Sequence, residues 1–142
     1  MDENAYRQVL STAIARPCPF EKSILMSCAT CSLAEKHNVA EREVVACSDQ
    51  TCLERCIELH DALRHNFAFA LHRRDTEAPL THAQEMRVQC GGLKGLQFSL
   101  DGSDEVSDVA ALVMQAKQRY GGLADYPYSQ IVQAASRYGK SR

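Results

Sequence analysis

The sequence has no tryptophan, no excess of charge of either sign and no long apolar run. Its 18 acidic and 16 basic residues leave a net charge of −2, so it lacks the basic footprint that nucleic-acid binding requires. No segment approaches the roughly 18 consecutive apolar residues of a membrane-spanning helix. We therefore expect neither nucleic-acid binding nor membrane insertion.

The first ten residues, MDENAYRQVL, lack the basic and apolar regions of a secretory signal. We therefore expect a cytoplasmic location. A length of 142 residues predicts a single domain over residues 1–142, because a chain of this size can bury its own core. The composition, 45% hydrophobic and 24% charged, is typical of a globular protein.

Familiar catalytic motifs are missing as well. The chain contains no HExxH metalloprotease motif, no CxxCH haem-attachment motif and no GxxxxGK[S/T] or GxGxxG phosphate loop. The glycine-rich segment CGGLKG at residues 90–95 therefore favours a turn or close packing. Without a nucleophile motif or a credible acid–base pair, we expect no independent catalytic activity.

Hydrophobic periodicity predicts a mainly α-helical fold of five or six helices. The strongest pattern covers residues 49–73, where Cys52, Cys56, Leu59 and Leu63 begin one apolar stripe. Other helices are expected at residues 3–15, 20–37, 103–120 and 127–138, and residues 40–46 are expected to form a short helix or turn. Residues 83–100 are open between strand and helix, because Met86, Val88 and Cys90 alternate like a strand whereas AQEMRVQ also suits a helix. We expect one short β element near residues 86–98, within an otherwise helical C-terminal part, residues 83–142.

Cysteine is the residue that the chain has in excess. Six of its seven cysteines lie between Cys18 and Cys56, with the spacing C-x9-C-x2-C-x15-C-x4-C-x3-C. Disulfides explain such a cluster poorly in a reducing compartment. We therefore predict that residues 18–56 form a metal-binding region, since thiolates are ligands of both zinc and iron–sulfur clusters.

Two pairs of cysteines are close in sequence, and two cysteines stand alone. Cys28 and Cys31 are three residues apart, and Cys52 and Cys56 are four apart, so each pair shares a helical face. One member of each pair and the two single residues give four ligands, and the predicted set is Cys18, Cys31, Cys47 and Cys56. Cys28 is adjacent to an apolar helical neighbour and Cys52 lies in a first turn, so these two are the alternates.

An iron–sulfur cluster, with [4Fe–4S] favoured, fits the irregular spacing better than the paired CxxC motifs of structural zinc sites. The function that follows is an electron-transfer or redox accessory module for a larger partner enzyme. A zinc-stabilised interaction or regulatory protein is the first alternative. The second is a thiol–disulfide redox protein that uses Cys28 and Cys31. Free cysteines also serve as buried apolar residues, and Cys90, outside the cluster, is assigned to such packing.

Overall fold

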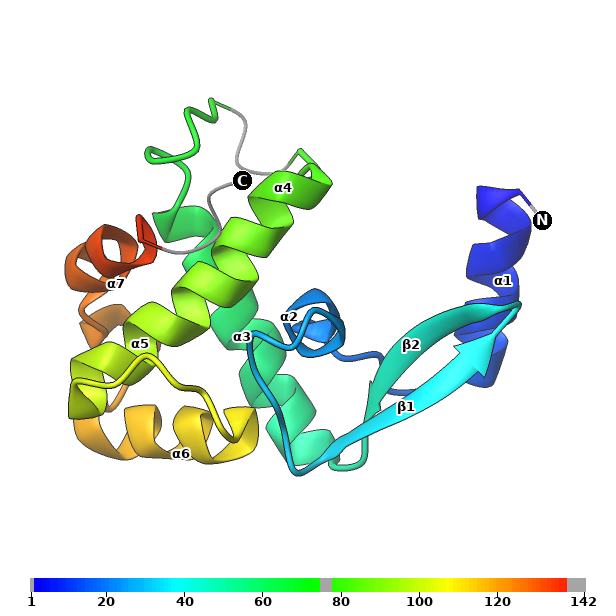
Figure 1. The fold of residues 1–142 in the computed structure, drawn as a ribbon, viewed down its shortest axis with the longest axis horizontal. Helices are drawn as coiled ribbons and strands as arrows, with labels where there is room; N and C mark the ends of the chain where they lie inside the picture. The colour runs from blue at the N-terminus through cyan, green and yellow to red at the C-terminus, as the bar shows by residue number, and fades with distance from the viewer. Residues whose placement is uncertain (1, 75–77, 138–142) are drawn as a thin grey trace.

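Helices dominate the chain, and one two-stranded hairpin interrupts them (Figure 1). The computed structural model describes residues 2–74 and 78–137. In these residues α4, the π-helical segment η1 and α5 form one continuous helix, so the mainly α prediction with a short β element is confirmed. The elements in order are α1 Glu3–Ala13, α2 Glu21–Leu25, β1 Ala34–Val39, β2 Arg42–Cys47, α3 Gln50–Asn66, α4 His82–Met86, η1 Arg87–Gly91, α5 Gly92–Asp101, α6 Val109–Tyr120, the 3-10 turn η2 Leu123–Asp125 and α7 Tyr128–Ala135.

The hairpin lies where the sequence predicts helices. The helix expected over residues 20–37 ends with α2 at Leu25. The short helix or turn expected over 40–46 is the hairpin turn followed by strand β2. Strands β1 and β2 pair in antiparallel register, from Ala34 opposite Cys47 to Val39 opposite Arg42. Packing overrides the helical preference of this Ala- and Glu-rich segment, because β2 buries its last four residues.

The sequence predicts a β element near residues 86–98, but this segment belongs to the continuous helix. Its glycines bring the helix against α7. A Cβ atom on Gly95 would lie 2.6 Å from the carbonyl oxygen of Ile131, and one on Gly91 would lie 2.8 Å from the Cβ of Ala135. The glycine-rich segment therefore provides close packing, which is one of the two roles that its sequence favours.

The main core forms around α3, whose apolar stripe is confirmed as a buried face. Leu59, Leu63 and Phe67 are all at most 2% exposed and pack with residues of α5, α6 and α7. A second, smaller cluster joins α1 to the hairpin through Tyr6 and Val44. Figure 1 shows the result: α1 and the hairpin lie to one side, and α3 runs from them into the helical part. None of the helices described here is long and apolar enough to cross a membrane.

Candidate functional site

Five cysteines with free thiols line one apolar hollow between α2, the end of β2 and the first turns of α3 and α6. They are Cys18, Cys31, Cys47, Cys52 and Cys56. Apolar side chains, among them Ile24, Leu53 and Val109, form the rest of its wall. Its volume is about 10 Å³, roughly what one water molecule needs, so the side chains close around it. The hollow therefore contains the whole predicted ligand set, together with the alternate Cys52.

Backbone hydrogen bonds hold Cys18 beside Cys47. The N–H of Cys18 donates to the carbonyl oxygen of Val45 at 2.9 Å, and the N–H of Cys47 donates to the carbonyl oxygen of Arg16 at 2.8 Å. The Arg16 side chain also donates from Nε to the carbonyl oxygen of Cys47 at 2.8 Å. The segment around Cys18 is therefore fixed along strand β2, which explains how a residue between two prolines reaches the site.

Residues 106–110 hold the loop that carries Cys31. The N–H of Thr30 donates to the carbonyl oxygen of Val106 at 3.1 Å, and the N–H of Ser32 donates to Oδ1 of Asp108 at 2.9 Å. The Ser32 hydroxyl donates to the same carboxylate. Hydrogen bonds on both sides of Cys31 therefore fix its backbone against the start of α6, 76 residues away in sequence from Ser32.

Helix α3 supplies the last two thiols. Its N-cap is Asp49, whose carboxylate accepts from the N–H of Cys52 at 2.8 Å. The sulfurs of Cys52 and Cys56 are 4.0 Å apart, one helical turn from each other, and both side chains are buried. The Cys47 thiol donates to the carbonyl oxygen of Asp49 at 3.2 Å, which ties the end of β2 to the start of this helix.

The environment of the hollow favours neutral thiols. Burial raises the pKa of Cys18 to about 12, and it also raises the pKa values of Cys31, Cys52 and Cys56. No lysine, arginine or histidine is among the residues that line the hollow, so no cation there stabilises a thiolate as in a catalytic cysteine site. Hydrogen bonds from the backbone N–H groups of Leu33 and Ala110 lower the pKa of Cys31, but less than burial raises it.

The thiols are not arranged around a single point. Four sulfurs around a tetrahedral zinc ion stand about 3.8 Å apart, given a zinc–sulfur distance near 2.3 Å. The Cys52–Cys56 pair approaches this spacing. Over residues 2–74 and 78–137, however, no three His, Cys, Asp or Glu side chains converge closely enough to hold one metal ion.

The remaining two cysteines form a disulfide. Cys28 is bonded to Cys90, with 5.9 Å between their Cα atoms, and the bond joins the loop after α2 to η1. Cys90 is buried, as its assignment to packing predicts, but it also forms this bond, which the sequence did not predict. Cys28 is therefore not free to replace a member of the predicted ligand set. Cys28 is bonded to Cys90 and not to Cys31, its partner in the CxxC motif. Disulfides persist mainly in oxidising compartments, so this bond does not favour the cytoplasmic location, which stays a prediction.

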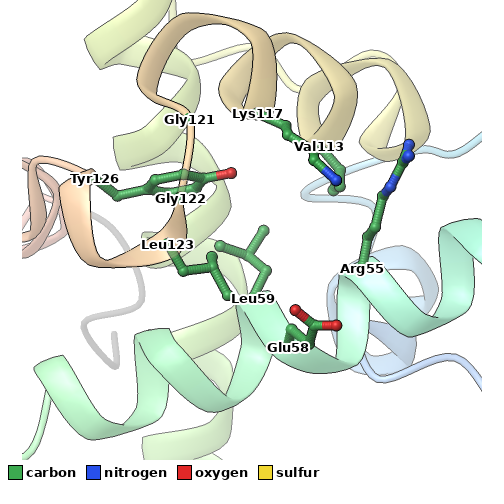
Figure 2. A pocket seen from close by; sticks show the side chains of 9 residues that line it. All are labelled: Arg55, Glu58, Leu59, Val113, Lys117, Gly121, Gly122, Leu123 and Tyr126. Carbon is green, nitrogen blue, oxygen red and sulfur yellow. The ribbon is translucent and has the colours of Figure 1, made fainter.

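A larger hollow lies on another side of α3, facing α6 and η2 (Figure 2). Its volume is about 360 Å³, and Tyr126, Leu59 and Leu123 point into it. Arg55, Glu58 and Lys117 also line it, but no cysteine or histidine does. This hollow therefore offers no thiol or imidazole ligand. All seven cysteines belong to the five-thiol hollow or to the disulfide.

No family model matches the chain, and no similar curated protein or solved structure was found. A function can therefore be inferred only from the geometry and chemistry of the described residues.

Proposed function

We propose that this protein binds an iron–sulfur cluster, with [4Fe–4S] favoured, in the five-thiol hollow and serves as an electron-transfer or redox accessory module. The observation that carries the proposal is the convergence of five free cysteines from four separate segments on one apolar space. Simple packing needs no such concentration of sulfur. Cluster ligands, in contrast, must come together from wherever they lie in sequence.

A cluster requires less convergence of the thiols on one point than a single zinc ion does. Each iron of a [4Fe–4S] cluster takes its own thiolate, so the four ligand sulfurs stand further apart than around one ion. The absence of three converging ligands in the described residues therefore disfavours zinc more than it disfavours a cluster. Cluster binding would release the thiol protons.

Cys18, Cys31 and Cys47 are proposed as three of the ligands, and Cys56 as the fourth. Cys18 and Cys31 are only partly buried, whereas Cys47, Cys52 and Cys56 are buried. Electrons would therefore enter and leave on the side of Cys18 and Cys31, where a larger redox partner enzyme would dock. The protein's own part is to hold the ligands rigidly and to keep water away from the sulfurs.

The experiment is the iron and sulfide content of single Ser variants after anaerobic purification. Cys18→Ser, Cys31→Ser and Cys47→Ser should each lose stoichiometric iron and sulfide. The matched control is the double variant Cys28→Ser/Cys90→Ser, which removes the same kind of side chain outside the hollow and should keep the parent's iron. Full iron in two of the three single variants would refute the ligand set, and stoichiometric zinc without sulfide in the parent would favour the zinc alternative.

A further inference from the structure

We propose that the larger hollow, between α3, α6 and η2, is a binding site for a small aromatic carboxylate. Its volume of about 360 Å³ lies within the range of about 300–1,000 Å³ that small-molecule sites occupy. The larger hollow and the five-thiol hollow both border α3 and α6, but they share no lining residue. This inference therefore goes beyond the proposed function and does not depend on it.

The hydroxyl group of Tyr126 is the feature that points to a ligand. Tyr126 is only 8% exposed, and Figure 2 shows its hydroxyl pointing into the larger hollow. The hydroxyls of both neighbouring tyrosines donate to the protein. That of Tyr120 donates to Oγ of Ser99 at 2.9 Å, and that of Tyr128 donates to the carbonyl oxygen of Leu123 at 2.7 Å. The Tyr126 hydroxyl has no hydrogen-bond partner in the part of the chain that the structure describes. Since buried polar groups are almost always hydrogen-bonded, this hydroxyl is available to a bound molecule.

Two cations without an acidic partner line the same hollow. The Arg55 guanidinium donates to Sδ of Met114, which is a weak acceptor, and the Lys117 side chain is exposed. Within the described segments, no ion pair includes either cation. Figure 2 shows both cationic groups across the hollow from the Tyr126 ring. An anion between them and the Tyr126 hydroxyl would therefore meet three donor groups.

The charges around the larger hollow favour a single carboxylate. The planar guanidinium of Arg55 matches a carboxylate with two parallel N–H donors, and the Lys117 ammonium can donate to the same group. Burial raises the pKa of Tyr126, so its hydroxyl keeps its proton at neutral pH and can donate as well. Glu58 also lines the hollow and leaves one positive charge in excess. A monoanion balances this charge, whereas a doubly charged phosphate group would exceed it.

The remaining lining residues suit a flat apolar ring. Leu59, Val113 and Leu123 form this part of the wall. The Tyr126 ring adds an aromatic surface, and a contact between two aromatic rings gains more than the burial of its area alone. The exposed Glu58 can accept a hydrogen bond from a hydroxyl group on the ring. The ligand class is therefore an aromatic monocarboxylate, to which a ring hydroxyl adds a contact with Glu58.

The test is a titration of the full chain with para-hydroxybenzoate, followed through the backbone amide signals in two-dimensional NMR. Saturable shifts should appear at Gly121 and Gly122, which line the hollow, with a Kd of about 1 mM or below. The neutral analogue para-hydroxybenzamide should bind about tenfold more weakly, because it lacks the charge that the cations recognise. No saturable shift at these two glycines, or equal affinities for the acid and the amide, would overturn the inference. Inorganic phosphate that binds there as tightly as the acid would overturn it too.

A pair of charge variants on α6 separates direct contact from general attraction. Lys117→Gln should weaken the binding of para-hydroxybenzoate about tenfold. Arg119→Gln is the matched control, because it removes the same charge from the same helix at a residue that does not line the hollow. Arg119→Gln should keep the parent's Kd. Equal Kd values for the two variants would show that the acid does not contact Lys117, and would overturn the inference.

Two tyrosine variants separate ligand binding from folding. Tyr126→Phe removes a hydroxyl that has no partner among the described residues, so the thermal midpoint should not change while para-hydroxybenzoate binds about fivefold more weakly. Tyr120→Phe should do the reverse, because its hydroxyl bonds to Ser99 and it does not line the hollow. A lower midpoint with an unchanged Kd in Tyr126→Phe would show that this hydroxyl serves the fold, and would overturn the inference.

Discussion

Cys52 and Cys56 lie one turn apart on α3 with their sulfurs 4.0 Å apart, and both line the same hollow. A four-ligand cluster that uses Cys18, Cys31 and Cys47 needs only one of them. Their separation along a rigid helix means that either thiol reaches the same space. The helix therefore carries a ligand and an alternate for it.

This arrangement predicts an asymmetry among the α3 variants. Cys52→Ser should keep the parent's iron, because Cys56 remains. Cys56→Ser should keep part of the iron, because Cys52 takes its place, and the double variant should keep none. Iron and sulfide analysis of the three proteins checks this, and stoichiometric iron in the double variant would show that α3 provides no ligand.

Asp108 should control how firmly the site holds its cluster. Its carboxylate accepts hydrogen bonds from Ser32 and from the N–H of Ala110, so it fixes the Cys31 loop and also caps α6. Asp108→Ala should cost about 1–2 kcal/mol in the free energy of unfolding, as other lost N-caps do. It should also release iron to a chelator faster than the parent does.

The control for Asp108 is Thr81→Ala, which removes the N-cap of α4 at a place outside the hollow. We expect a comparable loss of stability without faster iron release. Identical release rates for the two variants would show that capping as such, and not the contact with the Cys31 loop, sets the rate.

The partly buried Glu85 should make the stability of the fold depend on pH in the acid range. Burial alone would raise its pKa, but hydrogen bonds from His60 and Gln89 outweigh burial and hold the pKa below its ordinary value of 4.5. Because the folded-state pKa is lowered, this contribution to stability is complete above about pH 4.5 and disappears as the pH falls through the folded-state value.

Glu85→Gln removes this titration and keeps the shape of the side chain. Urea unfolding between pH 3 and pH 7 should show that the difference in stability between parent and variant is constant near neutrality and shrinks below about pH 4.5. A difference that does not change with pH would show that the pKa of Glu85 is the same in the folded and unfolded states.

The contact between α5 and α7 depends on the absence of a side chain at Gly95. A Cβ atom there would meet the Ile131 carbonyl oxygen at 2.6 Å, and backbone cannot move aside as a flexible side chain can. Gly95→Ala should therefore cost about 1–3 kcal/mol through overpacking. Gly122→Ala is the control, because the nearest atom to the added Cβ would be Asp125 Oδ2 at 3.9 Å and the φ of Gly122 is −79°. Thermal unfolding of both variants measures the difference, and equal midpoints would contradict this packing.

Local pattern was sufficient to predict helices α3, α6 and α7, because each buries one periodic apolar face. Helix α1 was predicted from the same kind of pattern, although Tyr6 is its one buried residue. It was not sufficient for the hairpin. Ala40 and Glu41 form its turn with φ values of 49° and 69°, where the usual sequence signal would be Asn-Gly or Asp-Gly. Strand β2 is buried by contacts with α1 and α2, which lie elsewhere in the sequence, so no local pattern predicts this burial.

The density of cysteines was enough to place a group of thiols in residues 18–56, and the structure brings the predicted four together with Cys52. The Cys28–Cys90 bond spans 62 residues, and spacing in sequence carries no information on such a pairing. The sequence also gives no sign that Asp108 contacts the Cys31 loop, because the two are 76 residues apart. The sequence predicts a helix that starts near residue 103, whereas α6 begins at Val109 and its N-cap, Asp108, faces the Cys31 loop.

The central claim is that the five-thiol hollow holds an iron–sulfur cluster, and the most direct measurement is the iron and acid-labile sulfide content of anaerobically purified parent protein, together with its visible absorbance. We expect a brown protein with about four irons and four sulfides per chain, as a [4Fe–4S] cluster requires. A colourless protein without iron or sulfide, obtained from iron-replete cells with the hollow's cysteines reduced, would contradict it.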